Sequence, residues 1–166
     1  FTIGPMTNGG FNVSLEVADV DGDGFNDLVY VDGTEVKAMV NDGVGNFSGP
    51  VTFTDGVFGS SYTVLGDVTG DCFDDMVKSG SFTYTAINNG DNTFQNQTSS
   101  NIDWPSYDHV EYRGTSLLDI DADGDLDLLS FRRIWNPDYG VGGHLNGYEN
   151  GFIWYAKNSG NGQFTG

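Results

Sequence analysis

The stretch Asp19-Val-Asp21-Gly-Asp23-Gly-Phe-Asn-Asp27 occurs three times in the chain with small changes, and the other two copies begin at Asp67 and Asp119. Carboxylates at the first, third, fifth and ninth positions put hard oxygen ligands on the inside of one tight loop. Ca²⁺ prefers six to eight oxygen ligands in a flexible cage, and such a loop supplies most of them. Because these carboxylates would repel one another without a cation, the repetition predicts cation-binding loops.

The predicted ligands are the side chains at positions 1, 3, 5 and 9 and the carbonyl at position 7. They are Asp19, Asp21, Asp23, Phe25 and Asp27; Asp67, Thr69, Asp71, Phe73 and Asp75; and Asp119, Asp121, Asp123, Asp125 and Asp127. The second loop has Thr69 in place of a carboxylate and Cys72 in place of glycine. Threonine removes a charged ligand, and a side chain at a position that favours positive φ adds strain. We therefore expect two strong Ca²⁺ sites and a weaker third in loop 2.

An EF-hand is the main alternative for an Asp-rich loop. It requires glutamate at position 12 and a helix on each side. Position 12 is Tyr30, Lys78 and Ser130 in the three loops, and the flanking sequences are typical of strands. The sequence thus excludes an EF-hand and its role as a conformational sensor.

Each loop is followed by an Asn/Gly-rich turn that ends in phenylalanine, at Asn41–Phe47, Asn88–Phe94 and Asn158–Phe164. Asn-Gly and Asp-Gly pairs supply the positive φ that hairpin turns need. Short stretches typical of strands lie between these landmarks, at Leu28–Val31, Val36–Val40, Phe82–Ile87 and Ile153–Ala156. Each unit is therefore predicted to form four antiparallel strands, with the Asp loop between the first two.

The phenylalanines give the repeat length, because Phe1, Phe47, Phe94 and Phe164 are 46, 47 and 70 residues apart. We divide the single domain, 1–166, into units at about 1–47, 48–94 and 95–166, the last with an insertion at about 131–150. A period near 47 with four strands per unit is typical of β-propeller blades. The predicted fold is all-β, with three four-stranded blades that form an open arc or part of a larger propeller.

The Asp loops and the Asn-x-Gly-x-Gly-x-Phe turns resemble FG-GAP/VCBS-type repeats, the blades of integrin α-chain propellers and of many secreted bacterial proteins. Phe58-Gly59-Ser60 is similar to the Phe-Gly step that names the family. The resemblance extends over essentially the whole chain and departs from the pattern at Thr69 and Cys72. It implies blades with Ca²⁺ in the Asp loops, an extracellular setting and a binding or adhesive role.

The composition narrows the expected partners and compartment. The 166 residues include 24 acidic and six basic ones, for a formal charge of −18, which argues against nucleic acid and anionic membranes as partners. No apolar run approaches transmembrane length, and the single Cys72 cannot form an internal disulfide. Weak Asp cages suit the millimolar Ca²⁺ outside cells. We expect a secreted or cell-surface protein and, since the chain starts at Phe1, a processed or excised segment.

The insertion in the third unit is rich in glycine and aromatic residues, among them Trp135, Tyr139 and Tyr148. These rings are candidates for stacking on sugars; the alternative is an ordered loop that packs them over its own blade. Sequons for N-glycosylation occur at Asn12, Asn46 and Asn96.

We expect no enzyme, because the sequence lacks a Gly-x-Ser-x-Gly, a His-Glu-x-x-His and a phosphate-binding loop. Three functions remain open. The first is a non-catalytic, extracellular Ca²⁺-binding structural or adhesive module that assembles head to tail, as a ring or filament, through its blade edges. The second is a lectin that binds glycans through the aromatic insertion, and the third is the accessory repeat region of a secreted hydrolase.

The ends of the chain are the predicted site of assembly. Phe164-Thr-Gly166 is in phase with the start of an outer strand, and Phe1–Thr7 has the sequence of such a strand. Unpaired strand edges are templates for pairing with another chain. We therefore expect Phe1–Thr7 to pair with a neighbouring copy or with a further repeat of a longer parent chain.

Overall fold

The structure is a computed structural model that describes residues 15–32, 35–54, 62–80, 82–91, 93–95, 98–100, 102, 110–136 and 148–166. The predicted pairing strand Phe1–Thr7, the Phe58-Gly59-Ser60 step, both histidines, Asn12, Asn96 and Tyr139 lie outside these residues. Over the described part of the chain all regular structure is β, and no helix there is long and apolar enough to cross a membrane.

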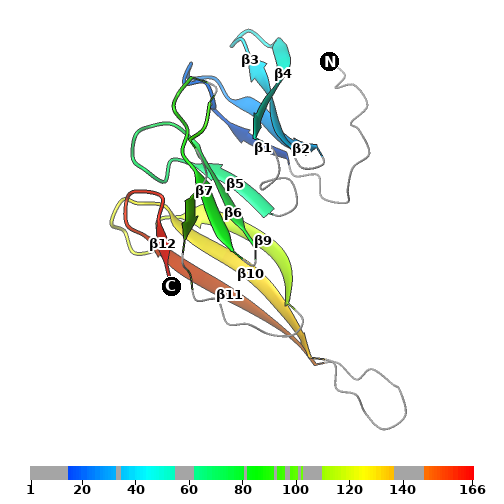
Figure 1. Cartoon of the computed structure of the whole chain (residues 1–166), viewed down its shortest axis with the longest axis vertical. Helices are drawn as coiled ribbons and strands as arrows, with labels where there is room; N and C mark the ends of the chain where they lie inside the picture. The colour runs from blue at the N-terminus through cyan, green and yellow to red at the C-terminus, as the bar shows by residue number, and fades with distance from the viewer. Residues whose placement is uncertain are drawn as a thin grey trace, which may run out of the picture.

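Three open, four-stranded antiparallel sheets follow one another along the chain, and we call them blades 1, 2 and 3 (Figure 1). Their strands are β1 (Leu15–Ala18), β2 (Asp27–Asp32), β3 (Glu35–Asn41) and β4 (Phe47–Thr54); β5 (Tyr62–Gly66), β6 (Asp75–Ser79), β7 (Thr83–Ala86) and β8 (Thr98–Ser100); and β9 (Val110–Leu118), β10 (Asp127–Asn136), β11 (Tyr148–Asn158) and β12 (Phe164–Thr165). In each blade the Asp loop joins the first two strands and the Asn/Gly-rich turn follows the third. The predicted fold class is confirmed.

Successive blades pack face to face. Since side chains alternate between the two faces of a strand, each blade has a forward and a rear face with different residues. The forward face of each blade carries the second residue after the last loop aspartate (Val29, Val77, Leu129), and the rear face carries the first (Leu28, Met76, Leu128). One apolar core joins Val29, Val31 and neighbours of blade 1 to Met76 and Ala86 of blade 2. A second joins Val68 and Val77 of blade 2 to Leu128, Ala156 and Phe164 of blade 3. At both interfaces a forward face thus meets the next rear face.

The insertion of blade 3 differs from a simple loop. β10 and β11 are ten and eleven residues long, and their register continues from Leu128–Ala156 out to Asn136–Tyr148. β9 runs beside β10 as far as Ile134, which pairs with Val110, so most of this extension is three strands wide (Figure 1). The described part of the insertion therefore lengthens β10 and β11, because its residues pair between these two strands rather than fold back over the blade.

The outer strands differ in length. β4 has eight residues, whereas β12 has two and pairs with β11 only at Lys157 and Asn158. The outer side of β11 thus offers more main-chain groups than β12 covers. Whether another strand pairs there stays a prediction.

Candidate metal centres in the Asp loops

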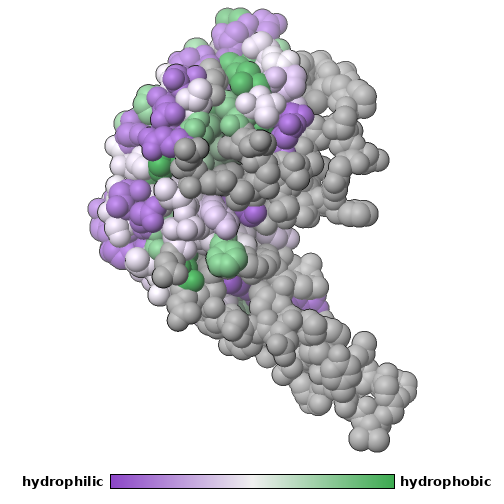
Figure 2. Space-filling view, in the orientation of Figure 1, coloured by the Kyte–Doolittle hydropathy of each residue, from purple (hydrophilic) through white to green (hydrophobic). Residues whose placement is uncertain are grey.

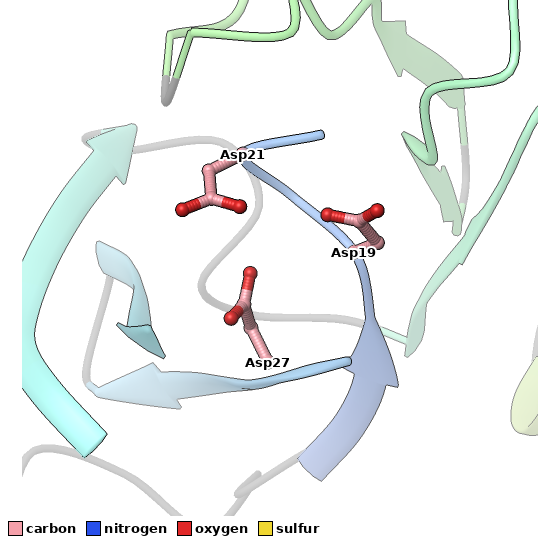
Figure 3. Close-up of side chains that lie close together, drawn as sticks. All are labelled: Asp19, Asp21 and Asp27. Atoms are coloured by element: carbon pink, nitrogen blue, oxygen red, sulfur yellow. The ribbon is translucent and has the colours of Figure 1, made fainter. Parts of the chain in front are cut away.

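Three carboxylates converge in loop 1. One oxygen each from Asp19, Asp21 and Asp27 lie within 4.8 Å of one another, and Figure 3 shows the three side chains pointing toward a common centre. Asp27 is fully buried, and the other two are partly buried. Hard carboxylate oxygens that converge on one point fit Ca²⁺ by donor type, although three side chains are fewer than the six to eight ligands it takes.

Main-chain hydrogen bonds hold this loop in shape. Asp19 accepts the N–H groups of Gly22 and Gly24, both at 2.8 Å. Asp27 accepts the N–H of Val20 at 3.1 Å and that of Asn41 at 2.8 Å, so it fastens the loop to the end of β3. An ionised carboxylate has about four acceptor positions, so these bonds leave room for a cation. Position 9 therefore has a structural role in addition to its predicted role as a ligand, and the sequence pattern did not predict it.

Loop 3 repeats the convergence with Asp119, Asp121 and Asp127, again within 4.8 Å. The main-chain bonds are also repeated, because Asp127 accepts the N–H groups of Ile120 at 3.2 Å and of Asn158 at 2.8 Å.

One cation of the chain lies at the edge of loop 3. The Nζ of Lys157 is 2.8 Å from Asp123 Oδ2 and also hydrogen-bonds Asp121. The hydrogen bond from Lys157 lowers the pKa of the Asp123 carboxyl below its usual range. Loop 3 therefore combines four carboxylates with an ammonium.

Loop 2 keeps the main-chain hydrogen bonds of loop 1, but its carboxylates do not converge on one point. Asp67 accepts the N–H groups of Gly70 at 2.7 Å and of Cys72 at 2.8 Å, as Asp19 does in loop 1. Among the described carboxylates no group of three forms here, and Thr69 Oγ1 lies 3.3 Å from Asp75 Oδ2. Burial raises the pKa of Asp75 to about 6, opposed by hydrogen bonds from Asn88 and Val68. Both features favour weaker cation binding in this loop.

Positions 5 and 7 play parts that their predicted ligand role does not include. Asp23 Oδ1 lies outside the group of three and accepts the N–H of Phe25 at 2.8 Å. The Phe25 ring covers Gly43 so closely that an added Cβ would lie 2.4 Å from it, and Phe73 covers Gly90 in the same way at 2.5 Å. The position-7 aromatic thus joins the Asp loop to the Asn/Gly-rich turn, and both glycines also have positive φ. The joint occurrence of Phe and Gly in units 1 and 2 is the signal that could have revealed this contact.

The other described candidate residues lie on the β10–β11 hairpin and in the turn of blade 1. The register pairs Trp135 with Glu149 and Tyr148 with Asn136, near the far end of the β10–β11 hairpin. Asn46 is exposed in the turn before β4, where its Nδ2 donates to Asp42 Oδ2 at 2.7 Å. Figure 2 shows hydrophilic residues gathered along the left margin of the view, where Figure 1 places the Asp loops.

Comparison with known families agrees with this architecture. Residues 5–77 match the FG-GAP-like repeat family. This match covers less than half of the chain. Together with the three four-stranded sheets, which fit propeller-type blades, it confirms the predicted resemblance. Among curated proteins, no significant match was found.

Solved structures with the same fold include two of very different size. A lectin of Agrocybe aegerita, described as recognising non-reducing terminal N-acetylglucosamine, is similar over 92% of this chain, with a TM-score of 0.58 and 21% identity. A chain of the Tc holotoxin pore of Photorhabdus luminescens is similar over 96%, with a TM-score of 0.61 and 19% identity. The chain spans 36% of the lectin chain and 7% of the toxin chain. At these identities the likeness establishes the fold alone.

Proposed function

We propose that this protein is a non-catalytic, extracellular Ca²⁺-binding module of the β-propeller type, in which the cation gives rigidity rather than chemistry. The observation that carries the proposal is the convergence of three carboxylates in loop 1 and again in loop 3. Like charges at such short range favour a bound cation. Ca²⁺ accepts more ligands and looser geometry than Mg²⁺. This suits loops whose converging carboxylates differ in how deeply they are buried.

Binding to the folded state alone would stabilise it. The ligands belong to one short loop, and Asp27 and Asp127 also fasten that loop to the third strand of its blade. A cation held by these residues would therefore resist the separation of the first three strands. We expect stabilisation and no large change of shape.

Calcium titration by calorimetry tests the proposal directly. We expect two strong sites, of which Asp21→Asn removes the one in loop 1 and Asp121→Asn the one in loop 3, and a weaker third site. Glu35→Gln is the matched control, since Glu35 is an exposed carboxylate paired with Lys37 outside the loops. Absence of Ca²⁺ binding in the wild type, or strongest binding in loop 2, would refute the proposal.

The module is proposed to work with further blades, from copies of itself or from a longer parent chain. Three four-stranded sheets form an open stack in this chain, whereas propellers typically close with about four to eight blades. A secreted or surface location supplies the Ca²⁺ concentration at which such Asp loops are filled.

A lectin is the second candidate, favoured by the fold that the chain shares with the Agrocybe aegerita lectin and by the position of Trp135 on the extended hairpin. A glycan array that includes terminal N-acetylglucosamine tests it, with Trp135→Ala as the variant and Phe82→Ala as the control. Phe82 is also an exposed aromatic residue, but it belongs to blade 2. Binding that is lost only in Trp135→Ala would favour the lectin.

A further inference from the structure

The two interfaces between blades share one polar contact. The asparagine that begins a turn donates its side-chain N–H to the Asp loop of the preceding blade. Asn88 Nδ2 donates to the Val20 carbonyl at 3.2 Å, and Asn158 Nδ2 donates to the Val68 carbonyl at 2.8 Å. Val20 and Val68 are the second residues of loops 1 and 2, and both are buried. The next blade therefore fastens the start of each of these two loops.

The interface between blades 1 and 2 adds a ring contact between the loops themselves. Phe73, at position 7 of loop 2, covers Gly22 of loop 1 so closely that an added Cβ there would lie 2.6 Å from the ring. The same ring covers Gly90 in its own turn, so it is held between two glycines. Gly22 donates its N–H to Asp19 at 2.8 Å. The ring thus braces the part of loop 1 that orients this predicted ligand.

The same interface also adds a carboxylate that bridges the two loops. Asp74, at position 8 of loop 2, is partly buried and accepts main-chain hydrogen bonds from Asp19 of loop 1 and from Asp67 of its own loop. Asp19 and Asp67 hold position 1 of their loops. The bond to Asp19 fixes the main chain that carries a predicted ligand, and the charge of Asp74 attracts a cation held nearby.

The interface between blades 2 and 3 lacks the ring contact. Gly70 holds in loop 2 the position that Gly22 holds in loop 1, and both have φ of 78°. Apart from its chain neighbours, no described atom lies within 4 Å of the place that a Cβ of Gly70 would take. Position 7 of loop 3 is Asp125, which contacts Gly160 of its own turn. The next blade therefore braces loop 1 at this position and not loop 2.

The bridging carboxylate is also replaced at the second interface. Position 8 of loop 3 is Leu126, whose side chain has no hydrogen-bond acceptor. It lies 3.1 Å from the place that a Cβ of Gly66 would take, next to the start of loop 2. An apolar contact thus stands where Asp74 makes a charged one. The two interfaces use the same loop positions, but only the first gives the preceding loop a charged partner.

We infer that Asp74 and Phe73 are positioning residues of the metal site in loop 1, so that two blades build this site. The inference rests on the proposed function and deepens it. Asp74 holds the main chain at Asp19, and Phe73 holds the turn at Gly22; neither supplies a ligand to loop 1. Replacing residues that orient metal ligands commonly weakens metal binding about 10- to 100-fold. Loop 1 should therefore depend on blade 2 for its affinity.

Calcium titration of the full chain by calorimetry tests the role of Asp74. In a protein whose loop 3 is disabled by Asp121→Asn, Asp74→Asn should weaken Ca²⁺ binding by loop 1 about tenfold. Asparagine already holds position 8 in loop 1, at Asn26, so we expect this variant to fold. Asp91→Asn is the matched control, because it removes the same charge from an exposed site in the turn of blade 2. It should leave the affinity of loop 1 unchanged.

Two further measurements separate positioning from a general loss of stability. In a protein whose loop 1 is disabled by Asp21→Asn, Asp74→Asn should leave Ca²⁺ binding by loop 3 unchanged. In chelator, the Asp19 amide should exchange its hydrogen faster in Asp74→Asn than in Asp91→Asn, because an uncharged acceptor makes a weaker bond. Unchanged affinity of loop 1, equal weakening of loops 1 and 3, or equal weakening of loop 1 by Asp91→Asn would overturn the inference for Asp74.

A double-mutant cycle tests the ring contact. Gly22→Ala and Gly70→Ala carry the same backbone strain, since the two glycines share one φ, but only the methyl at position 22 would meet Phe73. Gly22→Ala should therefore lower Tm in chelator more than Gly70→Ala does, and the excess should disappear in a Phe73→Ala protein. Equal losses in both alanine variants would overturn the role of the ring.

The wild type distinguishes failure of the inference from failure of the proposed function. A wild type that binds no Ca²⁺ would refute both. A wild type that binds Ca²⁺ in loop 1 with an affinity that Asp74→Asn leaves unchanged would refute the inference alone.

Discussion

Loops 1 and 3 have aspartates at the same four positions and bring the same three of them together, yet they differ in the charge that surrounds them. Loop 3 lies beside the ammonium of Lys157. Lys157 follows Ala156, the cross-strand partner of Leu128, and the residue in the equivalent place of blade 1 is Val40. The spacing of the aspartates thus determines which carboxylates converge, and a residue on a neighbouring strand determines how much of their charge is already balanced.

Removal of Ca²⁺ should have the largest effect. Each site at a hundredfold excess of Ca²⁺ over its Kd adds about 2.7 kcal/mol of stability, which is about 5–10 °C in Tm for a domain of this length. Calorimetric melting with and without chelator measures this difference. If loop 1 binds Ca²⁺ more strongly than loop 3, Asp21→Asn should remove more of the Ca²⁺-dependent gain in Tm than Asp121→Asn does. An equal loss in both variants would show that Lys157 does not distinguish the loops.

Restoring a carboxylate to loop 2 extends the comparison to a loop that lacks one. Thr69→Asp adds an acidic group near Asp75, whose carboxyl lies 3.3 Å from the Thr69 hydroxyl. The added repulsion should lower the melting temperature in chelator. In Ca²⁺ the variant should instead be more stable than the wild type, by up to about 2.7 kcal/mol when Ca²⁺ is a hundredfold above the Kd of the new site. Thr69→Asn, which is uncharged, is the control and should show neither change. A Thr69→Asp protein that gains no Ca²⁺ affinity would mean that the backbone of loop 2 is unsuited to the cation.

Replacing Lys157 by methionine tests the difference between loops 1 and 3 itself. In a protein whose loop 1 is disabled by Asp21→Asn, Lys157→Met should tighten Ca²⁺ binding by loop 3 about tenfold, because a competing positive charge is removed. In chelator the same variant should melt lower, since Asp121 and Asp123 lose their cationic partner. Lys37→Met, which removes a lysine paired with Glu35, is the control. Unchanged affinity in Lys157→Met would leave the charge argument without support.

The repeating features were predictable from the sequence because they depend on residues close together in the chain. The Asp spacing, the turn glycines and the alternation of apolar residues gave the four-stranded units and the carboxylates that meet in loops 1 and 3. The contacts that distinguish the blades join distant residues. Lys157 is 36 residues from Asp121, and Asn158 is 90 residues from Val68. Such contacts depend on strand register and on which faces of the blades meet, and a local pattern specifies neither.

The smallest expected effect concerns the backbone of loop 2. Cys72 has φ of 74°, whereas the equivalent residues of loops 1 and 3 are Gly24 and Gly124, with φ of 88° and 97°. Its N–H nevertheless donates to Asp67 at 2.8 Å, the distance at which Gly24 donates to Asp19. The loop thus keeps its shape against the left-handed strain of a side chain, so Cys72→Gly should stabilise the protein by about 1 kcal/mol, less the entropy that glycine adds to the unfolded chain.

Cys72→Ala separates strain from the chemistry of the thiol, because alanine keeps the Cβ that makes the left-handed conformation costly. Denaturant unfolding should therefore show a gain for Cys72→Gly and none for Cys72→Ala. The gain should be the same in chelator and in Ca²⁺, since strain in the backbone does not depend on the cation. If alanine stabilises as much as glycine, the thiol and not the backbone limits loop 2. If the gain appears only in Ca²⁺, Cys72 acts on the metal site, and the difference between loop 2 and loops 1 and 3 is then not confined to the Thr69 ligand.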